Sequence, residues 1–281
     1  MKIIKDIEEV IAIRKSIKDK SVGLIHLSGN LHPGSIQVVK KLCAMCSVRF
    51  ATIFLNPFIE NFEEIKNVCD NCQENDFSTL EGENIDYLFC PDVKDIFPEN
   101  QLTEVRPEKI IEKFREYKSE KYIISMATLF FKLLNLIQPD FIFVGQKNFL
   151  DLFILKQIVK DFDMDLNVVI SPTLRNEDGI PYSSNLQNLT EEEKKIASDI
   201  YKVFSEIRSK IAEGENSASS LIKIVKEKLN NLENFHLKNA EILNMKNFSE
   251  IEKIEGESVL VILGEIDGKK YSDAIFLKSK I

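Results

Sequence analysis

The sequence predicts an α/β protein in which a Rossmann-like, doubly wound parallel sheet is followed by a smaller C-terminal α+β domain. Three observations support this prediction. Short apolar runs typical of buried strands alternate with helical patterns along the first two-thirds of the chain. A glycine-containing loop joins an early strand pattern to a helix. After Leu189 the pattern changes to charged helices followed by short strands.

The first elements have the order of a βαβ unit. Isoleucine and valine recur near helical spacing over residues 7–19, which predicts a helix. The apolar run at 22–27 predicts a buried strand, and a helix is expected from Ser35 to about Cys46. With a further strand at 49–55, this order opens a parallel sheet.

The alternation continues in the middle of the chain. Strands are predicted at 86–91, 141–144 and 167–170, with helices at 125–136 and 149–162 between them. Strands that alternate with helices over this length favour a doubly wound sheet with parallel strands.

The last third of the chain predicts a separate domain, so that the chain divides into residues 1–187 and 188–281. Thr190 is a suitable N-cap for a charged helix with an acidic first turn. One amphipathic helix and two strands are expected after it, at 219–232, 259–263 and 273–277.

The composition favours a packed, acidic protein of the cytoplasm. Hydrophobic residues make up 44% of the 281 residues, which is enough for a sizeable core. The formal net charge of -8, without a long Lys/Arg run, argues against a nucleic-acid partner. Charges interrupt the apolar residues at the N-terminus and elsewhere, so neither a secretory signal nor a membrane span is expected.

Four of the five cysteines form two CxxC pairs, Cys43/Cys46 and Cys69/Cys72. Four thiolates at this spacing suit tetrahedral zinc. The first pair, however, lies in an apolar helical run rather than in a polar turn. Reduced thiols of a cytosolic protein are therefore the preferred interpretation, and no metal-ligating residues are predicted.

Residues 28–35, between a predicted strand and a predicted helix, are the first candidate for chemistry. Such a junction presents free backbone N–H groups and the positive end of a helix dipole. Gly29 and Gly34 would let a phosphate approach the backbone, and His32 could stabilise charge on a phosphate in reaction. A tight turn with a surface histidine is the simpler alternative.

Two further loops could bind phosphate. Gly145 and Lys147 follow a predicted strand, and ligands of open α/β sheets bind outside the carboxyl ends of the strands. Ser183 and Ser184 place two hydroxyl groups on a later polar loop. A solvated lysine and an ordinary Gly/Ser loop are the corresponding structural alternatives.

The order and spacing of these loops resemble the pantothenate synthetase family, within the HIGH/KMSKS nucleotidyltransferase superfamily. Residues 28–35 read Ser-Gly-Asn-Leu-His-Pro-Gly-Ser, against Met-Gly-Ala-Leu-His-x-Gly-His in the family. Residues 53–57 read Ile-Phe-Leu-Asn-Pro, similar to Ile-Phe-Val-Asn-Pro. Residues 132–140 resemble Lys-Leu-Phe-Asn-x-x-Gln-Pro-Asp, and residues 172–180 resemble Pro-Thr-x-Arg-Glu-x-Asp-Gly-Leu. The resemblance extends over nearly the whole chain.

The resemblance implies an ATP-dependent condensation of pantoate with β-alanine through a pantoyl adenylate, with Mg²⁺ on the phosphates. It also implies that a homodimer could form. The catalytic residues carried over from the family are His32, Lys147 and Ser35. The residues carried over as ATP-binding are Gly29, Gly34, Gly145, Ser183, Ser184 and Asn148. The positions that correspond to substrate binding are Ile59 and Asp151.

Several of these positions depart from the family pattern. Ser35 stands where the family has a second histidine, and Asn148 where it has an aspartate expected near the ribose. Asn185 stands where an arginine follows the two serines. Ile59 and Asp151 replace the two glutamines that hold pantoate. A lost hydrogen bond to a charged group costs about 1.5–3 kcal/mol, so the use of pantoate is expected to weaken unless other residues compensate.

Three interpretations therefore stay open. The chain could be a divergent but working pantothenate synthetase. It could adenylate a different, less polar carboxylic acid. It could also bind a nucleotide or a partner protein without catalysis, since a fold alone does not carry a function.

Overall fold

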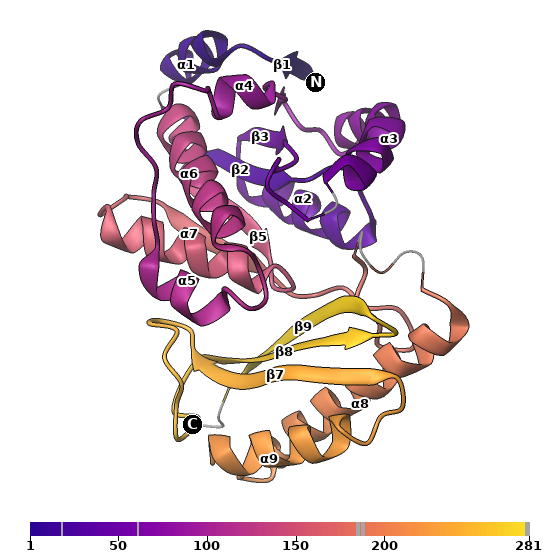
Figure 1. The fold of residues 1–281 in the computed structure, drawn as a ribbon. Helices are drawn as coiled ribbons and strands as arrows, with labels where there is room; N and C mark the ends of the chain where they lie inside the picture. The colour runs from indigo at the N-terminus through magenta and orange to yellow at the C-terminus, as the bar shows by residue number, and fades with distance from the viewer. Residues whose placement is uncertain (18, 61, 184–185, 187–188, 279–281) are drawn as a thin grey trace. The chain divides into compact units, whose positions relative to one another are not determined.

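The chain forms two compact units, Met1–Ser171 and Pro172–Ile281. Its computed structural model describes residues 1–281 apart from 18, 61, 184–185, 187–188 and 279–281 (Figure 1). A domain boundary at residue 187, as expected from the sequence, stays a prediction.

The first unit is built on a parallel sheet whose described strands follow the order β1-β4-β3-β2-β5-β6. The strands are β1 (Lys2–Ile4), β2 (Val22–Leu27), β3 (Val48–Ile53), β4 (Tyr87–Phe89), β5 (Phe141–Gly145) and β6 (Asn167–Ser171). From β2 the chain passes to β3 on one side, and it later returns to β5 on the other. The topological switch point therefore lies between β2 and β5, and the predicted doubly wound parallel sheet is confirmed.

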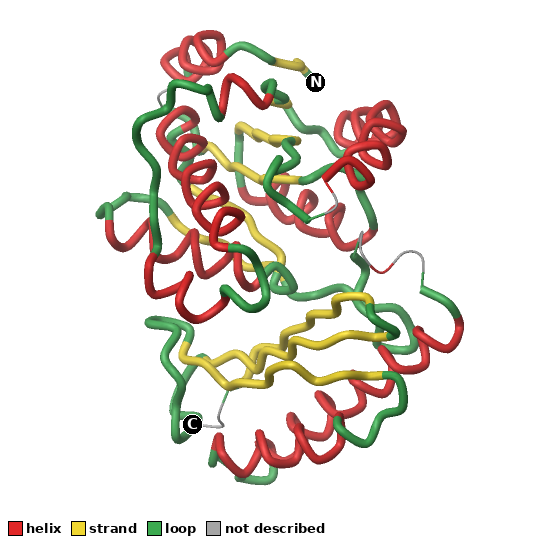
Figure 2. The backbone as a smooth tube through the Cα atoms, viewed as in Figure 1, coloured by secondary structure: helices red, strands yellow, loops and turns green. Residues whose placement is uncertain are grey.

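Helices accompany the strands of this sheet (Figure 2). They are α1 (Ile7–Ser16), α2 (Pro33–Met45), α3 (Phe62–Gly82), α4 (Val93–Ile96), α5 (Glu108–Phe114), α6 (Glu120–Ile137) and α7 (Phe149–Asp161). Ile25 and Leu27 of β2 share an apolar cluster with α2. His26, between them, meets the ring of Phe130 on α6 at 5.6 Å. Because successive strand residues point to opposite faces, α2 and α6 cover opposite faces of the sheet.

Helix α6 is the most apolar helix of this unit and is longer than the sequence predicted. It begins at Ser119, whose side chain accepts a hydrogen bond from the Tyr122 N–H. It ends at Gln138, which takes the left-handed conformation with φ 45° and is followed by Pro139. Every residue from Ile123 to Phe130 is buried, which makes α6 a central core element.

The second unit packs two helices, α8 (Glu191–Ala212) and α9 (Ala218–Leu229), along one face of an antiparallel sheet (Figure 1). The sheet order is β7 (Phe235–Asn244), β8 (Ser258–Ile266) and β9 (Lys269–Leu277). Thr190 and Glu193 form a capping box at the start of α8. Asp267 and Gly268 turn β8 into β9 with φ values of 47° and 77°. This is the smaller α+β part that the sequence predicted.

No helix in the described parts of the chain combines the length and the apolar character needed to cross a membrane.

Candidate functional site

The candidate site of the first unit lies where β2 and β5 end. Loop 28–32 follows β2, and Gln146 to Asn148 follow β5. Because the two strands are parallel neighbours, both loops leave the same edge of the sheet. They flank the switch point, which is where open α/β sheets bind ligands.

Two left-handed residues shape loop 28–32. Gly29 has φ 88° and Asn30 has φ 52°. A Cβ atom at Gly29 would lie 3.1 Å from the Cys69 Sγ atom, so this position also has little room. The backbone conformation and the close contact therefore both favour glycine at position 29. Its contact with ATP stays a prediction.

Asp76 on α3 holds this loop by its backbone. Its Oδ2 accepts a hydrogen bond from the Asn30 N–H at 2.7 Å, and its Oδ1 accepts one from the Leu31 N–H at 2.9 Å. Asp76 is only 1% exposed, and burial raises the pKa of its carboxyl although both backbone bonds oppose this. Asp76 was not predicted from the sequence. It is 46 residues from the loop that it binds, and no local motif marks such a contact.

The cysteines of α3 also face this loop. The Cys69 thiol donates to the Ser28 carbonyl at 3.2 Å, and the Cys72 thiol lies 3.6 Å from Asn30 Oδ1. Cys43 donates to the Glu83 carbonyl at 3.1 Å. Among the described residues, no group of three or more His, Cys, Asp or Glu side chains is arranged to hold a metal ion.

His32 and Ser35 together form a capping box at the start of α2. The His32 Nδ1 atom accepts a hydrogen bond from the Ser35 N–H at 3.3 Å. The Ser35 Oγ atom accepts one from the His32 N–H and donates one to the His32 carbonyl, both at 3.0 Å. Ser35 therefore shapes the helix start, and the catalytic role expected of it stays a prediction.

The ring of His32 is neutral at pH 7 and has a defined tautomer. Burial lowers its pKa to about 4, and the nearby positive charge of Lys147 acts in the same direction. Because Nδ1 accepts a hydrogen bond, the ring proton is on Nε2, which makes Nε2–H a donor. In the described chain the Gly34 N–H makes no hydrogen bond, so a second donor is available at the same helix end.

The loop after β5 brings Lys147 to His32. Their electrostatic interaction places the predicted cation beside the predicted histidine. A Cβ atom at Gly145 would meet only Val38 Cγ2, at 3.8 Å, so packing alone does not require glycine there. Asn148 begins α7 without a side-chain capping bond, and its side chain is exposed. The structure therefore brings His32, Gly34, Gly145 and Lys147 to one edge.

The two expected substrate positions lie on other elements of the same unit. Ile59 is in the turn after β3, where its N–H donates to the Asn56 carbonyl at 3.1 Å. Asp151 is in the first turn of α7. Burial raises the pKa of Asp151 to about 7, against the opposing charge of Lys118. Near neutral pH its carboxyl is thus partly protonated, and the repulsion expected toward a carboxylate substrate is weaker than for an ordinary aspartate.

In the second unit, a buried ion pair holds the loop that leads to Ser183. The two terminal nitrogens of Arg175 donate to Asp273, at 2.7 and 2.9 Å. Arg175 also donates to the Gly179 carbonyl at 3.0 Å, and its guanidinium lies 4.8 Å from the ring centre of Tyr201. Asp273 is 0% exposed and also accepts a bond from the Tyr271 hydroxyl. The sequence marked Arg175 only as part of a motif, and its partner is 98 residues away.

Ser183 follows this loop, and its carbonyl accepts a hydrogen bond from the Leu186 N–H at 3.0 Å. Ser184 and Asn185 lie outside the described residues. A phosphate-binding role of the serine pair stays a prediction.

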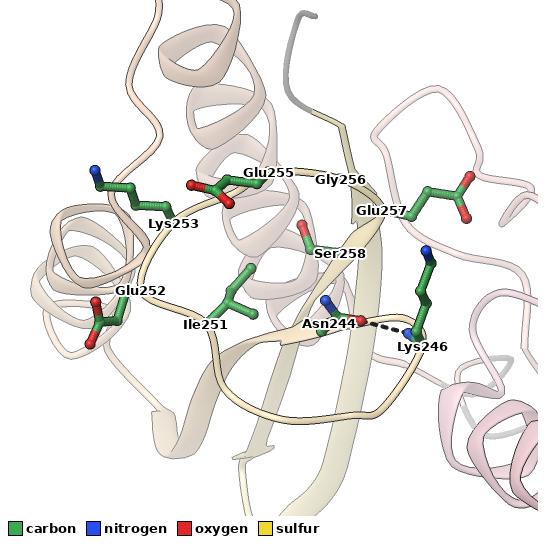
Figure 3. Close-up of a pocket in the computed structure, with 9 residues that line it drawn as sticks. All are labelled: Asn244, Lys246, Ile251, Glu252, Lys253, Glu255, Gly256, Glu257 and Ser258. Carbon is green, nitrogen blue, oxygen red and sulfur yellow. Dashed lines mark hydrogen bonds between the residues drawn. The ribbon is translucent and has the colours of Figure 1, made fainter.

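A pocket of the second unit contains none of the predicted site residues (Figure 3). It is lined by the segment that connects β7 to β8, with Asn244 at the end of β7, Ile251 in the loop and Ser258 at the start of β8. Charged side chains form its rim, namely Lys246, Glu252, Lys253, Glu255 and Glu257. Its mixture of acidic and basic side chains is typical of a solvated surface. The predicted site residues lie instead at the carboxyl edge of the parallel sheet.

Comparison with known proteins identifies relatives over the whole length. The family model described as pantoate-beta-alanine ligase matches residues 2–273. The pantothenate synthetase of Caldicellulosiruptor bescii is 31% identical over 283 residues, covering 100% of both chains. That of Francisella tularensis subsp. novicida is 32% identical over 241 residues, covering 82% of this chain and 90% of the relative.

Solved structures agree with this. Pantothenate synthetase from Thermus thermophilus superposes with a TM-score of 0.86 at 22% identity, over 98% of this chain and 99% of that one, which shows the fold. Pantoate-beta-alanine ligase from Francisella tularensis, complexed with beta-gamma ATP and beta-alanine, has a TM-score of 0.75. It is 25% identical and covers 98% of this chain and 97% of that one.

Proposed function

The chain belongs to the pantoate–β-alanine ligase family, and we propose that it condenses pantoate with β-alanine in an ATP-dependent reaction. In the first step the pantoate carboxylate attacks the α-phosphorus of ATP, and pyrophosphate leaves. In the second step the β-alanine amine attacks the acyl carbon of the adenylate, AMP leaves, and the amine loses a proton. The observation that carries the proposal is the position of Lys147 close enough to His32 to interact with it electrostatically, at the switch point of the sheet.

The geometry of the first unit supports phosphate binding in this reaction. The Nε2–H of His32 and the N–H of Gly34 are donors at the positive end of α2, and Lys147 adds a full positive charge beside them. Fixed donors at this place stabilise negative charge that develops on the α-phosphate in the transition state. We assign catalytic roles to His32 and Lys147, with Ser35 supporting His32.

The proposed ATP-binding residues include further positions. The open space at Gly145 lets a nucleotide approach the backbone, and Gly29 sets the turn of the first loop. Asn148 is proposed near the ribose, and Ser183 and Ser184 near the phosphates. Mg²⁺ is proposed to arrive on the ATP phosphates, which are its usual ligands.

The acid-binding side is proposed to use Asp151 in place of a glutamine. In its protonated form the carboxyl can donate a hydrogen bond to a carboxylate, as an amide does. Ile59 contributes only an apolar wall. That apolar residue favours a second candidate function, the adenylation of a less polar carboxylic acid.

Two further properties are proposed with the function. We propose a cytoplasmic location, because all five cysteines are free thiols and thiols stay reduced in that compartment. A homodimer is proposed from the family resemblance.

The test is product formation by the purified full chain with ATP, Mg²⁺, pantoate and β-alanine. Pantothenate and AMP should form in equal amounts. His32→Asn keeps an N-cap acceptor at α2 and removes the imidazole, and Lys147→Met removes the charge. Each should lower kcat/KM by at least about 100-fold with little change in Tm. ATP binding without any pantothenate would contradict the proposal, and product from another acid would select the second candidate.

A further inference from the structure

The second step of the proposed reaction requires a group that accepts a proton. At pH 7 the amine of β-alanine is an ammonium, as a lysine side chain is, and it has no electron pair with which to attack. His32 is a poor acceptor, because its pKa is about 4 and its Nδ1 atom already binds the Ser35 N–H. Lys147 is a cation, and both oxygens of Asp76 hold backbone N–H groups. These residues therefore leave the proton transfer to another group.

A carboxyl group lies just after the loop that carries Lys147. Asp151 is in the first turn of α7, about 5 Å along the helix axis from the N-cap residue Asn148. The residue is partly exposed, although its carboxyl is strongly desolvated. A substrate could therefore reach a carboxyl whose surroundings hold little water.

The segment before α6 packs against this first turn of α7. Tyr117 stacks on Phe149, the first residue of α7, with ring centroids 5.9 Å apart. The Lys118 Nζ atom lies 5.6 Å from the ring centroid of Tyr117 and 5.1 Å from that of Tyr122 on α6. Lys118 and Tyr122 each interact electrostatically with Asp151. The starts of α6 and α7 thus form one cluster around the Asp151 carboxyl.

This cluster adjusts the carboxyl to proton transfer near neutral pH. Burial raises the pKa of Asp151 to about 7, and the positive charge of Lys118 opposes this shift. Burial and the charge of Asp151 hold the pKa of Tyr122 well above its ordinary value, so its phenol stays protonated. A general base works best when its pKa is near the working pH, and an ordinary aspartate is a much weaker base.

We propose that Asp151 is the general base of the second step and accepts a proton from the ammonium of β-alanine. The electron pair freed on nitrogen forms the C–N bond to the acyl carbon, and the bond from that carbon to the AMP oxygen breaks with its electrons on the phosphate. The second proton of the nitrogen passes to the departing phosphate, and Asp151 returns its proton to water. This role rests on the proposed function for the reaction itself.

The two steps need opposite protonation states of Asp151. In the first step the protonated carboxyl faces a substrate carboxylate, to which it can donate a hydrogen bond. The adenylate no longer carries that carboxylate charge, so the ionised form of Asp151 is not repelled in the second step. A pKa of about 7 makes both forms accessible at neutral pH.

The pH dependence of kcat/KM for β-alanine tests this role in the purified full chain with ATP, Mg²⁺ and pantoate. In the wild type the value should rise to about pH 7 and then stay level to about pH 9, because Asp151 supplies the base. Asp151→Asn keeps a hydrogen-bond donor and removes the base. Its kcat/KM should be about 100-fold lower at pH 7 and should rise about tenfold per pH unit toward pH 9, because only the free amine reacts.

Hydroxylamine separates the loss of a base from damage to the rest of the site. It is uncharged at pH 7, so it attacks the adenylate without a base and gives a hydroxamate. Asp151→Asn should form the hydroxamate at nearly the rate of the wild type, which would show that the variant is folded and makes the adenylate. Asp161→Asn, exposed at the other end of α7, is the matched control and should keep the wild-type pH profile.

A profile that is level above pH 7 in Asp151→Asn would overturn the role of Asp151 and leave the proposed function standing. A wild-type profile that rises about tenfold per pH unit between about pH 7 and 9 would do the same. That second result needs no variant, so it decides the question even if Asp151→Asn does not fold. A wild-type chain that makes neither pantothenate nor hydroxamate would overturn the proposed function itself.

Discussion

The two loops proposed to contact ATP phosphates are held in place by different physical means. In loop 28–32 of the first unit, the carboxylate of Asp76 accepts two backbone N–H groups. In the loop of the second unit that leads to Ser183, the guanidinium of Arg175 joins the Gly179 carbonyl to Asp273. We call these two arrangements clamps. The first-unit clamp consists of hydrogen bonds from backbone N–H groups to Asp76, and the second-unit clamp contains a buried ion pair.

The difference determines how each loop responds to substitution. A buried ion pair that loses one member leaves an uncompensated charge, which is strongly destabilising. The loss of one acceptor for backbone N–H groups leaves an unpaired N–H, which costs about 1–3 kcal/mol and therefore less than an unpaired buried charge. The second-unit clamp should therefore affect stability most, and the first-unit clamp should affect ligand binding more than stability.

Removal of the Arg175 charge should have the largest effect. Arg175→Met leaves Asp273 buried without its cation, and the free energy of unfolding should fall by about 3–5 kcal/mol. Denaturant unfolding followed by circular dichroism measures this. Arg208→Met, at an exposed position of α8, is the control and should change stability by less than about 0.5 kcal/mol. A loss below about 1 kcal/mol for Arg175→Met would contradict the ion-pair account.

The glycines of the two loops give a paired comparison. Gly179 and Gly29 both have positive φ, but a Cβ at Gly179 would overlap the ring of Tyr201, whereas at Gly29 it would lie 3.1 Å from Cys69 Sγ. Gly179→Ala should cost about 3 kcal/mol and Gly29→Ala about 1–2 kcal/mol, by chemical denaturation. Combining Gly179→Ala with Tyr201→Ala should make the two effects less than additive. Equal costs for the two single variants would count against this packing difference.

Asp76→Asn tests the first clamp. An amide offers one acceptor oxygen where the carboxylate offers two, so one loop N–H loses its partner. Stability should fall by about 1–2 kcal/mol, and ATP binding should weaken because His32 is less well positioned. Asp70→Asn, exposed on the same helix and paired with Lys66, is the control. If Asp76→Asn bound ATP as the wild type does, Asp76 would have no role in the site.

A pH dependence of stability should arise in the first unit from groups whose contributions partly cancel in the wild type. Burial lowers the pKa of His26 and of His32 to about 4, from 6.5 in the unfolded chain. Between these values the unfolded state binds more protons, so stability falls as pH decreases from about 6.5 to 4. Asp151, with its pKa raised to about 7, contributes in the opposite direction over this range.

A difference curve separates these contributions. His26→Asn keeps a polar partner for Thr52, 3.0 Å away, and removes one titrating group. Subtracting its unfolding free energy from that of the wild type should leave a slope that approaches about 1.4 kcal/mol per pH unit. A flat difference between pH 4 and 6.5 would show that His26 is not held neutral by burial.

The sequence predicted those parts of the fold and site that are encoded locally. The apolar runs and the Gly-containing turns placed His32, Gly145 and Lys147 at or just after the ends of the correct strands, because such junctions depend on neighbouring residues. Ser35 was expected to act in catalysis, and the structure shows that it also has a local role. It lies three residues after the N-cap His32 and completes a capping box with it.

The parts that sequence reasoning missed depend on long-range contacts. Strand β7 and helix α3 were not predicted, and Asp76 and Asp273 act on loops 46 and 98 residues away. No local spacing marks such partners, and only the burial and hydrogen bonds of the folded chain identify them.

Pyrophosphate exchange into ATP, with and without pantoate, tests the central claim most directly, because it isolates adenylation from the second step. The account predicts exchange that requires pantoate, is nearly lost in Lys147→Met and His32→Asn, and persists in the Arg208→Met control. An absence of pantoate-dependent exchange in a wild-type chain that binds ATP would contradict it.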